Sequence, residues 1–137
     1  MRDLEKFYLA IDNNDVEGLE ELIQKNAALP DHIGAPPRLH WAIYQDRPEI
    51  AKVLLKYPLD VERRDSDRAA TPLEYAIVYG RTEIIRLLLG HGVNTRGVIA
   101  LAERATAGGF EQYAELPSRA EYESVAQLLR QIIDKDE

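Results

Sequence analysis

The sequence predicts an all-α solenoid built from stacked helix-turn-helix units. Two observations lead to this fold class: apolar residues recur at helical spacing, and the same apolar pattern returns at a fixed interval along the chain. The third observation is composition. A chain of 137 residues, 45 % hydrophobic and 30 % charged, is typical of one globular domain with enough apolar side chains to form a core.

The repeat is clearest in the middle of the chain. Residues 39–43 align with residues 73–77, and residues 49–55 align with residues 83–89, so both segments recur at the same offset. An earlier copy places Phe7, Ala10 and Ile11 at a slightly shorter offset before their counterparts in 39–43. The chain therefore contains several copies of one supersecondary unit.

Each copy is predicted to form two short helices joined by a polar turn. The apolar positions 39, 42 and 43 mark the buried side of a first helix, and positions 50, 53 and 54 mark that of a second. Pro48 and Thr82 suit helix starts, since proline is tolerated in the first turn and threonine can act as a cap. Gly92 suits a helix end.

The third copy resembles an ankyrin repeat almost from end to end. The resemblance is carried by Thr71-Pro72-Leu73-Glu74-Tyr75-Ala76, by Gly80, by residues 83–89 and by Gly92-Val93-Asn94. It implies that the Thr-Pro pair opens the first helix, that the leucine run packs the second, and that the glycine ends it. The second copy has a degraded opening but keeps the histidine of the family at His40.

We expect one domain, 1–137, with four repeats at about 3–33, 34–67, 68–97 and 98–133. The terminal repeats match the pattern poorly, which is typical of capping repeats because one of their faces meets water. The last repeat contains an insertion at about 106–121. The connection that precedes this repeat is short, so a projecting loop is not expected there.

The sequence offers little support for catalysis. It has no cysteine, and its histidines, His32, His40 and His91, are not spaced as metal ligands on one helix face. His40 has a structural explanation, because its ring can hydrogen-bond the neighbouring turn. We therefore predict a protein that is not an enzyme and that uses no metal or cofactor.

The net charge of −7 disfavours a nucleic-acid partner. The sequence shows neither a signal peptide nor an apolar run of membrane-spanning length, which indicates a cytoplasmic protein without a membrane partner. Residues 1–33 and 110–137 are acidic, with net charges of −5 and −4, respectively. These ends are either solvated faces or surfaces that attract a basic partner.

The candidate binding residues lie opposite the buried side of the first helices and in the loop after the second repeat. Exposed aromatic side chains are typical of interface hot spots. The alternatives are that Trp41 and Tyr75 pack between neighbouring helices and that the charged loop is a solvated turn. The predicted set is Trp41, Tyr44, Gln45, Tyr75, Val78 and Tyr79 on the helices, with Arg63, Arg64, Asp65, Asp67 and Arg68 in the loop.

The resemblance implies that the first-helix face and such loops form the binding surface, as is usual in ankyrin proteins. We therefore expect a protein that is a monomer on its own and binds a protein partner through its concave face and finger loops. The acidic ends suggest an inhibitor or immunity protein for a basic toxin. The alternative is a structural or assembly subunit of a larger complex.

Overall fold

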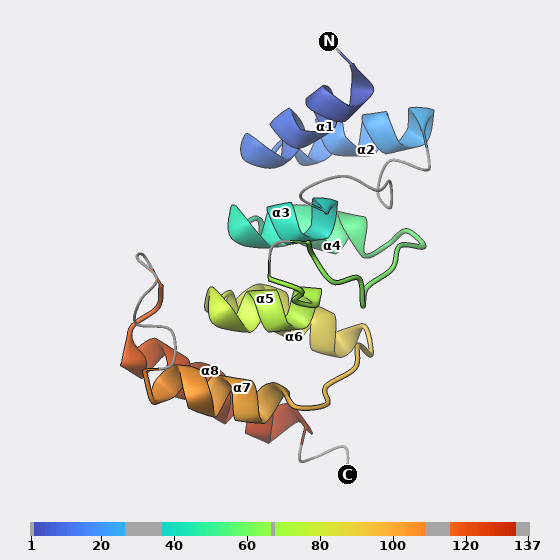
Figure 1. The fold of residues 1–137 in the computed structure, drawn as a ribbon. Coiled ribbons are helices and arrows are strands. Elements are labelled where there is room, and N and C mark those ends of the chain that lie inside the picture. Colours follow the sequence, from blue (N-terminus) through green and yellow to red (C-terminus); the bar gives the residue numbers. More distant parts are fainter. Residues whose placement is uncertain (1, 27–36, 67, 109–115, 134–137) are drawn as a thin grey trace. The chain divides into compact units, whose positions relative to one another are not determined.

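The computed structural model describes residues 2–26, 37–66, 68–108 and 116–133. Within these residues the chain forms eight α-helices and no β-strand (Figure 1). The all-α prediction is therefore confirmed. The chain divides into two compact units, Met1–Pro72 and Leu73–Glu137, and each is described by itself. The expectation that all 137 residues form a single domain stays a prediction.

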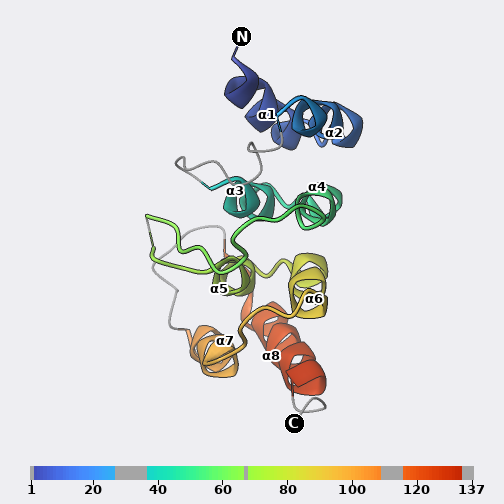
Figure 2. The same ribbon diagram turned by 90° about the vertical axis from the view of Figure 1, so that its right-hand side faces the viewer.

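Unit 1 contains two helix pairs. The first pair is α1 (Asp3–Asp12) and α2 (Val16–Lys25), and the second is α3 (Arg38–Tyr44) and α4 (Pro48–Leu54). Helix α1 contacts α3, and α2 contacts α4, so the two pairs stack on one another (Figure 2). This is the arrangement that the repeat in the sequence predicts.

Unit 2 contains the third and fourth pairs. They are α5 (Pro72–Val78) with α6 (Thr82–Gly90), and α7 (Val98–Thr106) with α8 (Arg119–Ile133). The division into units falls after Pro72, the first residue of α5. All four pairs lie within the predicted repeat boundaries.

The turn inside each of the first three pairs is built identically. The residue after the cap lies in the left-handed region, as Asn14 (φ 55°), Asp46 (φ 55°) and Gly80 (φ 68°). Its amide donates to the carbonyl oxygen of an isoleucine, and the next amide donates to that of an alanine. These two bonds define the Schellman motif, and Asn, Asp and Gly are the residues that best tolerate its backbone.

The predicted core positions are buried. In the second repeat Ala42, Ile43, Ile50 and Leu54 have no exposed surface, and neither do the corresponding Ala76, Ile77, Ile84 and Leu88 of the third repeat. The phase of the helical pattern is therefore confirmed. The fully buried large side chains of the core include Phe7, Ile11, Leu19, Ile23, Leu73, Ile77, Ile84 and Ile85.

Two local expectations are wrong. Thr82 is the first residue of α6 and not its cap; Arg81 holds the cap position, and its side chain makes no capping hydrogen bond. The insertion is shorter than 106–121, because Thr106 still belongs to α7 and α8 begins at Arg119. A reciprocal pair of bonds starts α8: the Glu121 amide donates to the Ser118 hydroxyl, and the Ser118 amide donates to the Glu121 carboxylate.

Candidate functional site

An aromatic cluster lies on the first helices of unit 1. We call it the α1–α3 patch; it consists of Tyr8, Trp41 and Tyr44, and we include the exposed Leu9, which follows Tyr8 on α1. The Trp41 and Tyr44 rings stack with centroids 5.6 Å apart and planes 15° apart. The Tyr8 ring meets Trp41 edge-on, with centroids 6.4 Å apart. The patch forms because α1 and α3 pack side by side and turn their buried positions toward the core.

A hydrogen bond fixes the central ring of the patch. The indole Nε1 of Trp41 donates to Oδ1 of Asp12, the last residue of α1, over 2.7 Å. Arg47 ties the same helix end to the second repeat, since its guanidinium donates to the carbonyl oxygens of Ile11 at 3.3 Å and Asp12 at 2.8 Å. Trp41 is half-buried, and its hydrogen bond holds the ring in place without a partner.

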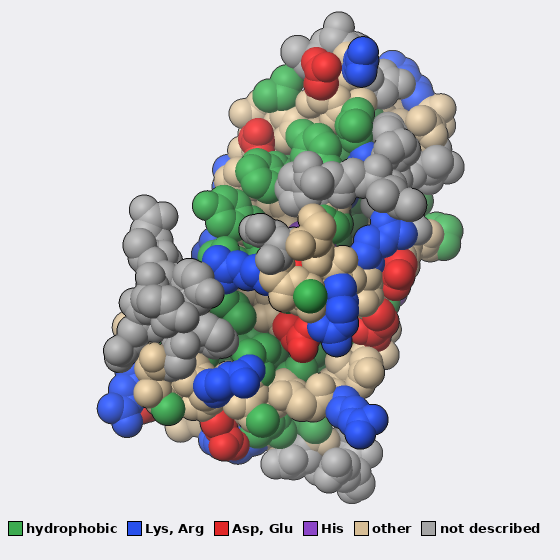
Figure 3. All heavy atoms as spheres, in the orientation of Figure 1, with side chains coloured by type: hydrophobic (Ala, Val, Ile, Leu, Met, Phe, Trp, Pro, Cys, Tyr) green, Lys and Arg blue, Asp and Glu red, His purple; other side chains and the backbone are tan. Residues whose placement is uncertain are grey.

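The patch is open to solvent at its edges. Leu9 and Tyr44 are each 43 % exposed, and both are large hydrophobic side chains. Figure 3 shows hydrophobic side chains (green) gathered over α1 and α3, with acidic side chains (red) beside them. Gln45, predicted as part of this surface, is half-buried at the C-terminal end of α3, where its backbone amide donates to the Trp41 carbonyl oxygen.

The inner side of Tyr8 is already covered by a cation. Arg38 is only 1 % exposed, and its guanidinium carbon lies 5.3 Å from the Tyr8 ring centroid and 5.8 Å from that of Phe7. Burial raises the pKa of the Tyr8 hydroxyl above its usual value, although the charge of Arg38 acts in the opposite direction. Tyr8 is therefore a neutral hydroxyl at physiological pH.

Unit 2 has its own aromatic pair. Tyr75 and Tyr79, both on the predicted binding side of the third repeat, are half-buried and meet edge to face with centroids 4.8 Å apart. The guanidinium carbon of Arg81 lies 5.8 Å from the Tyr79 ring centroid.

Val78 is predicted on the same surface, and this prediction is wrong. Its exposed fraction is only 8 %. Its carbonyl oxygen accepts a hydrogen bond from the hydroxyl of the buried Tyr122 on α8, over 2.5 Å. The end of α5 is thus enclosed by a contact with the last helix of the following repeat.

The loop after α4 is a finger organised by one carboxylate. Asp65 is 9 % exposed, and its side chain accepts hydrogen bonds from the amides of Ala70 at 2.8 Å and Arg68 at 3.4 Å. The backbone amide of Asp65 donates to the carbonyl oxygen of Ala70, which closes the loop. Asp65 is predicted as a binding residue, and its burial and hydrogen bonds contradict that prediction: its carboxylate shapes the finger. Asp67 lies outside the described residues.

The finger arginines differ in their surroundings. Arg63 is half-buried, and its Nε lies 4.0 Å from the carboxylate of Asp60. Arg64 is exposed and donates to the carbonyl oxygen of Ala69 at 2.6 Å, and Arg68 is exposed as well. Arg64 and Arg68 are thus the finger charges most accessible from solvent.

His40 connects the finger to α3, as the sequence indicates. Its Nε2 lies 2.8 Å from the carbonyl oxygen of Ala70. Because a carbonyl oxygen only accepts, Nε2 carries the proton and donates it. Burial lowers the pKa of His40 below its usual value, although the Ala70 bond and Asp65 act in the opposite direction. The ring is therefore neutral at physiological pH.

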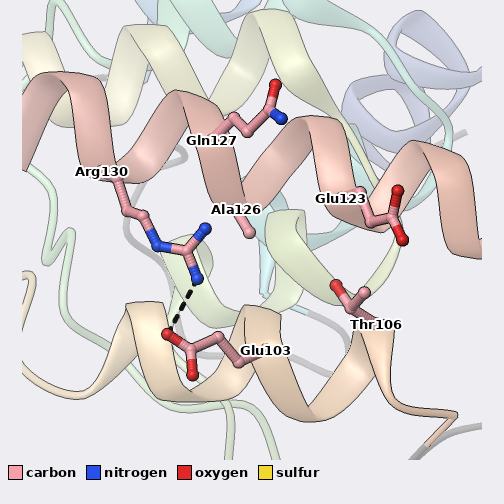
Figure 4. Close-up of a pocket in the computed structure, with 6 residues that line it drawn as sticks. All are labelled: Glu103, Thr106, Glu123, Ala126, Gln127 and Arg130. Atoms are coloured by element: carbon pink, nitrogen blue, oxygen red, sulfur yellow. Dashed lines mark hydrogen bonds and ion pairs between the residues drawn. The ribbon is translucent and has the colours of Figure 1, made fainter.

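A hollow of about 240 Å³ lies between α7 and α8 (Figure 4). Arg130 of α8 reaches Glu103 of α7 across it, with Nη2 and Oε1 3.0 Å apart, and both side chains are about half exposed. A further ion pair joins Arg119 and Glu123 at 3.4 Å. Such a polar, solvated surface is typical of the outer face of a terminal repeat. The lining residues are Glu103, Thr106, Glu123, Ala126, Gln127 and Arg130.

Within the part of the chain that the structure describes, no three histidine or carboxylate residues are close enough to hold a metal ion together. No described helix combines the length and the apolar character needed to span a membrane.

Sequence reasoning missed two members of the patch and its carboxylate. When the first repeat is aligned with the second, Leu9 falls on Trp41 and Asp12 falls on Tyr44. The alignment alone could therefore have identified Leu9 and Asp12 as residues on the same face as Trp41 and Tyr44. Tyr8 stands at the position of His40 in the same alignment, and only its contact with Trp41 reveals its role.

Comparison with known proteins places these units in context. The family described as ankyrin repeats, in three copies, matches residues 7–99, which is more than half of the chain. The palmitoyltransferase AKR1 of Lachancea kluyveri is 30 % identical over 95 residues, covering 66 % of this chain and 13 % of that protein. XBAT34 of Arabidopsis thaliana, named as a putative E3 ubiquitin-protein ligase, is 32 % identical over 93 residues, covering 66 % and 25 %. The chain thus spans a quarter or less of either relative.

Proposed function

Since the chain belongs to the ankyrin-repeat family, whose repeats generally act as non-catalytic interaction modules, we propose that it binds a protein partner through the α1–α3 patch. The observation that carries the proposal is the exposure of Tyr44, whose ring stacks on the fixed ring of Trp41, together with the exposure of Leu9 on α1. Their exposed fractions of 43 % leave apolar surface that a partner could cover.

The patch has the properties of an interface hot spot. Tryptophan and tyrosine are enriched among residues that dominate binding energy. The bond to Asp12 and the stack on Tyr44 hold the Trp41 ring in one orientation, so binding costs little side-chain entropy at this position.

The finger and the aromatic pair of unit 2 are proposed as further contacts. Arg64 and Arg68 are exposed and would meet acidic groups of a partner in a salt-dependent way. Tyr75 and Tyr79 present a second aromatic surface on the first helix of the third repeat. Each of these surfaces is proposed on its own unit, following the concave-face and finger-loop binding mode expected from the sequence.

We further propose a non-enzymatic, cytoplasmic role. The acidic charge at residues 1–33 favours an inhibitor or immunity protein for a basic toxin. The second candidate, a permanent subunit of a larger complex, rests on the aromatic character of the patch, because obligate interfaces are the more apolar class. A toxin-like gene beside this one would favour the inhibitor, and an operon for a metabolic or structural assembly would favour the subunit.

The test is an affinity comparison with the purified partner, once affinity capture from the native host has identified it. Replacing Tyr44 or Tyr79 with alanine is expected to weaken binding by more than about 1 kcal/mol, as for hot-spot residues. The matched controls are Lys52→Ala and Arg86→Ala, because both side chains are exposed on the second helices α4 and α6. The proposal fails if a control variant loses binding while both tyrosine variants keep it.

A further inference from the structure

We propose that Ser66, in the finger that follows α4, is a phosphorylation site for a serine kinase that recognises arginine side chains. The group transferred is the terminal phosphoryl group of ATP, and its transfer reverses the charge of the finger. The site itself is argued from the finger alone. Its consequence for partner binding rests on the proposed function.

The hydroxyl of Ser66 differs from those of the other two serines in the chain. The Ser118 hydroxyl accepts a hydrogen bond from the amide of Glu121 at the start of α8, over 3.2 Å. The Ser124 hydroxyl donates to the carbonyl oxygen of Ala120 within the same helix, also over 3.2 Å. Ser66 is exposed and makes no hydrogen bond with a described residue. Its oxygen can therefore accept a phosphoryl group without first losing a bond of the fold.

Two arginines precede Ser66, because Arg63 and Arg64 stand three and two positions before it. Kinases that select basic substrates hold such side chains with carboxylates, since a guanidinium forms paired hydrogen bonds with a carboxylate. Neither Ser118 nor Ser124 has an arginine or a lysine among the three residues before it. The charge pattern therefore distinguishes Ser66 from both other serines.

The backbone around Ser66 is accessible to an enzyme cleft. Residues 63–65 lie outside helix, strand and turn, and the finger projects from the helix pair α3–α4 (Figure 2). Both arginines have contacts that a kinase must replace: Arg64 donates to the Ala69 carbonyl oxygen, and Arg63 lies beside Asp60. Water already competes for these groups, so exchanging such contacts for carboxylates of the kinase costs little.

The modification leaves the brace of the finger in place. Asp65 is 9 % exposed, and its carboxylate accepts from the amides of Ala70 and Arg68, whereas the next side chain, Ser66, is exposed. The phosphate is therefore added on the solvent side of the loop, while the carboxylate that shapes the loop stays on the inner side.

The transfer needs no group of the finger besides the Ser66 hydroxyl. Its oxygen forms a bond to the γ-phosphorus of ATP, and the bond between that phosphorus and the oxygen that bridges it to ADP breaks. The hydroxyl proton passes to a carboxylate of the kinase, and ADP leaves with the electron pair of the broken bond.

The phosphate changes the sign of the finger charge. Residues 63–68 contain three arginines and two aspartates, which gives a net charge of +1. A phosphate adds about −1.5 to −2 at pH 7, so the net charge of the finger becomes negative. A finger that attracts acidic groups of a partner then repels them, so phosphorylation of Ser66 would weaken that contact.

The experiment treats the folded full chain with ATP and the catalytic subunit of cyclic-AMP-dependent protein kinase, which prefers arginine at these two positions. Mass spectrometry of the intact chain and of its fragments counts and locates the phosphate. We expect one phosphate, on Ser66, and none on the finger of Ser66→Ala. Ser124→Ala, which removes an exposed hydroxyl from α8, should be modified as the unaltered protein is.

Arginine variants test the recognition. Arg64→Gln should be phosphorylated about threefold or more slowly, because one charged pair with the kinase is lost. Arg96→Gln, which removes an exposed arginine between α6 and α7, should react at the unaltered rate. Amide exchange of Ala70 is measured beside the rate, so that slow transfer to a chain with a protected Ala70 amide reports recognition and not a changed loop.

Three results would each overturn the site: no phosphate on Ser66, phosphate only after the chain has been unfolded, or equal rates for Arg64→Gln and the unaltered protein. None of them touches the proposed function, which is tested by the tyrosine variants and the native partner. If those variants keep the partner, the proposed function fails and the phosphorylation site stands.

The consequence for binding is measured with the same partner. The phosphorylated chain should bind about threefold or more weakly at low salt, and the difference should shrink as the salt concentration rises. Equal binding of the phosphorylated and unmodified chains at low salt would overturn the regulatory role of Ser66.

Discussion

Replacing His40 with leucine should weaken the fold in a way that depends on pH. The variant loses the hydrogen bond from Nε2 to the Ala70 carbonyl oxygen, a 2.8 Å contact made by a side chain that is only 1 % exposed. Leucine fills much of the same volume, so the cost is chiefly that of one hydrogen bond. We expect a loss of about 1 kcal/mol of unfolding free energy near pH 8, the usual net value of such a bond.

The pH dependence has a definite sign. The pKa of His40 in the folded protein lies below the unfolded value of 6.5, chiefly because of burial. Between these two values the unfolded chain binds more protons, so the free energy of unfolding falls as the pH drops below 6.5 and through the folded pKa. The leucine variant lacks this contribution. The difference in unfolding free energy between the two proteins should therefore become smaller as the pH is lowered.

Urea denaturation of both proteins near pH 8 and near pH 5 measures this difference, and amide exchange of Ala70 and Asp65 reports on the finger itself. A difference that is constant between the two pH values, or one that grows in acid, would refute the assignment of His40 as a neutral donor. Unchanged amide protection in the variant would mean that the finger does not depend on this bond.

Two further predictions concern stability. Leu54→Ala and Leu88→Ala should each cost about 2–5 kcal/mol in chemical denaturation, because both side chains are fully enclosed; a cost below about half a kilocalorie for both would contradict the packing described above. Tyr122→Phe should cost about 0.5–1.5 kcal/mol, because it removes only the hydroxyl that donates to the Val78 carbonyl oxygen; no loss in thermal or urea unfolding would mean that this bond does not hold α8 to α5.

Most of the fold could be predicted from the sequence because the patterns that define a repeat lie within short segments of the chain. Apolar spacing and the alternation of helix and polar turn can be recognised within a single repeat, and the three Schellman turns follow from Asn14, Asp46 and Gly80 at matching positions. The role of His40 could also be predicted, because the family resemblance gives that position a structural role.

The errors at the candidate site come from contacts outside one repeat or from loop geometry. Val78 occupies the position of Tyr44 in the alignment, yet Tyr122 from the distant α8 encloses it. Asp65 looks like any charge in a polar loop, and its role depends on a carboxylate geometry that composition does not reveal. Cross-helix pairing of the kind that joins Trp41 to Asp12 is equally invisible in the sequence.

The placement of the single tryptophan has a practical consequence for cooperativity. Trp41 belongs to unit 1, so its emission follows the melting of that unit, whereas far-UV circular dichroism reports on helices from both. Coincident curves would mean that nearest-neighbour coupling makes all four helix pairs melt as one block, and separated midpoints would mean that the pairs melt stepwise. The protein thus carries its own intrinsic probe of how far cooperativity extends along a short repeat array.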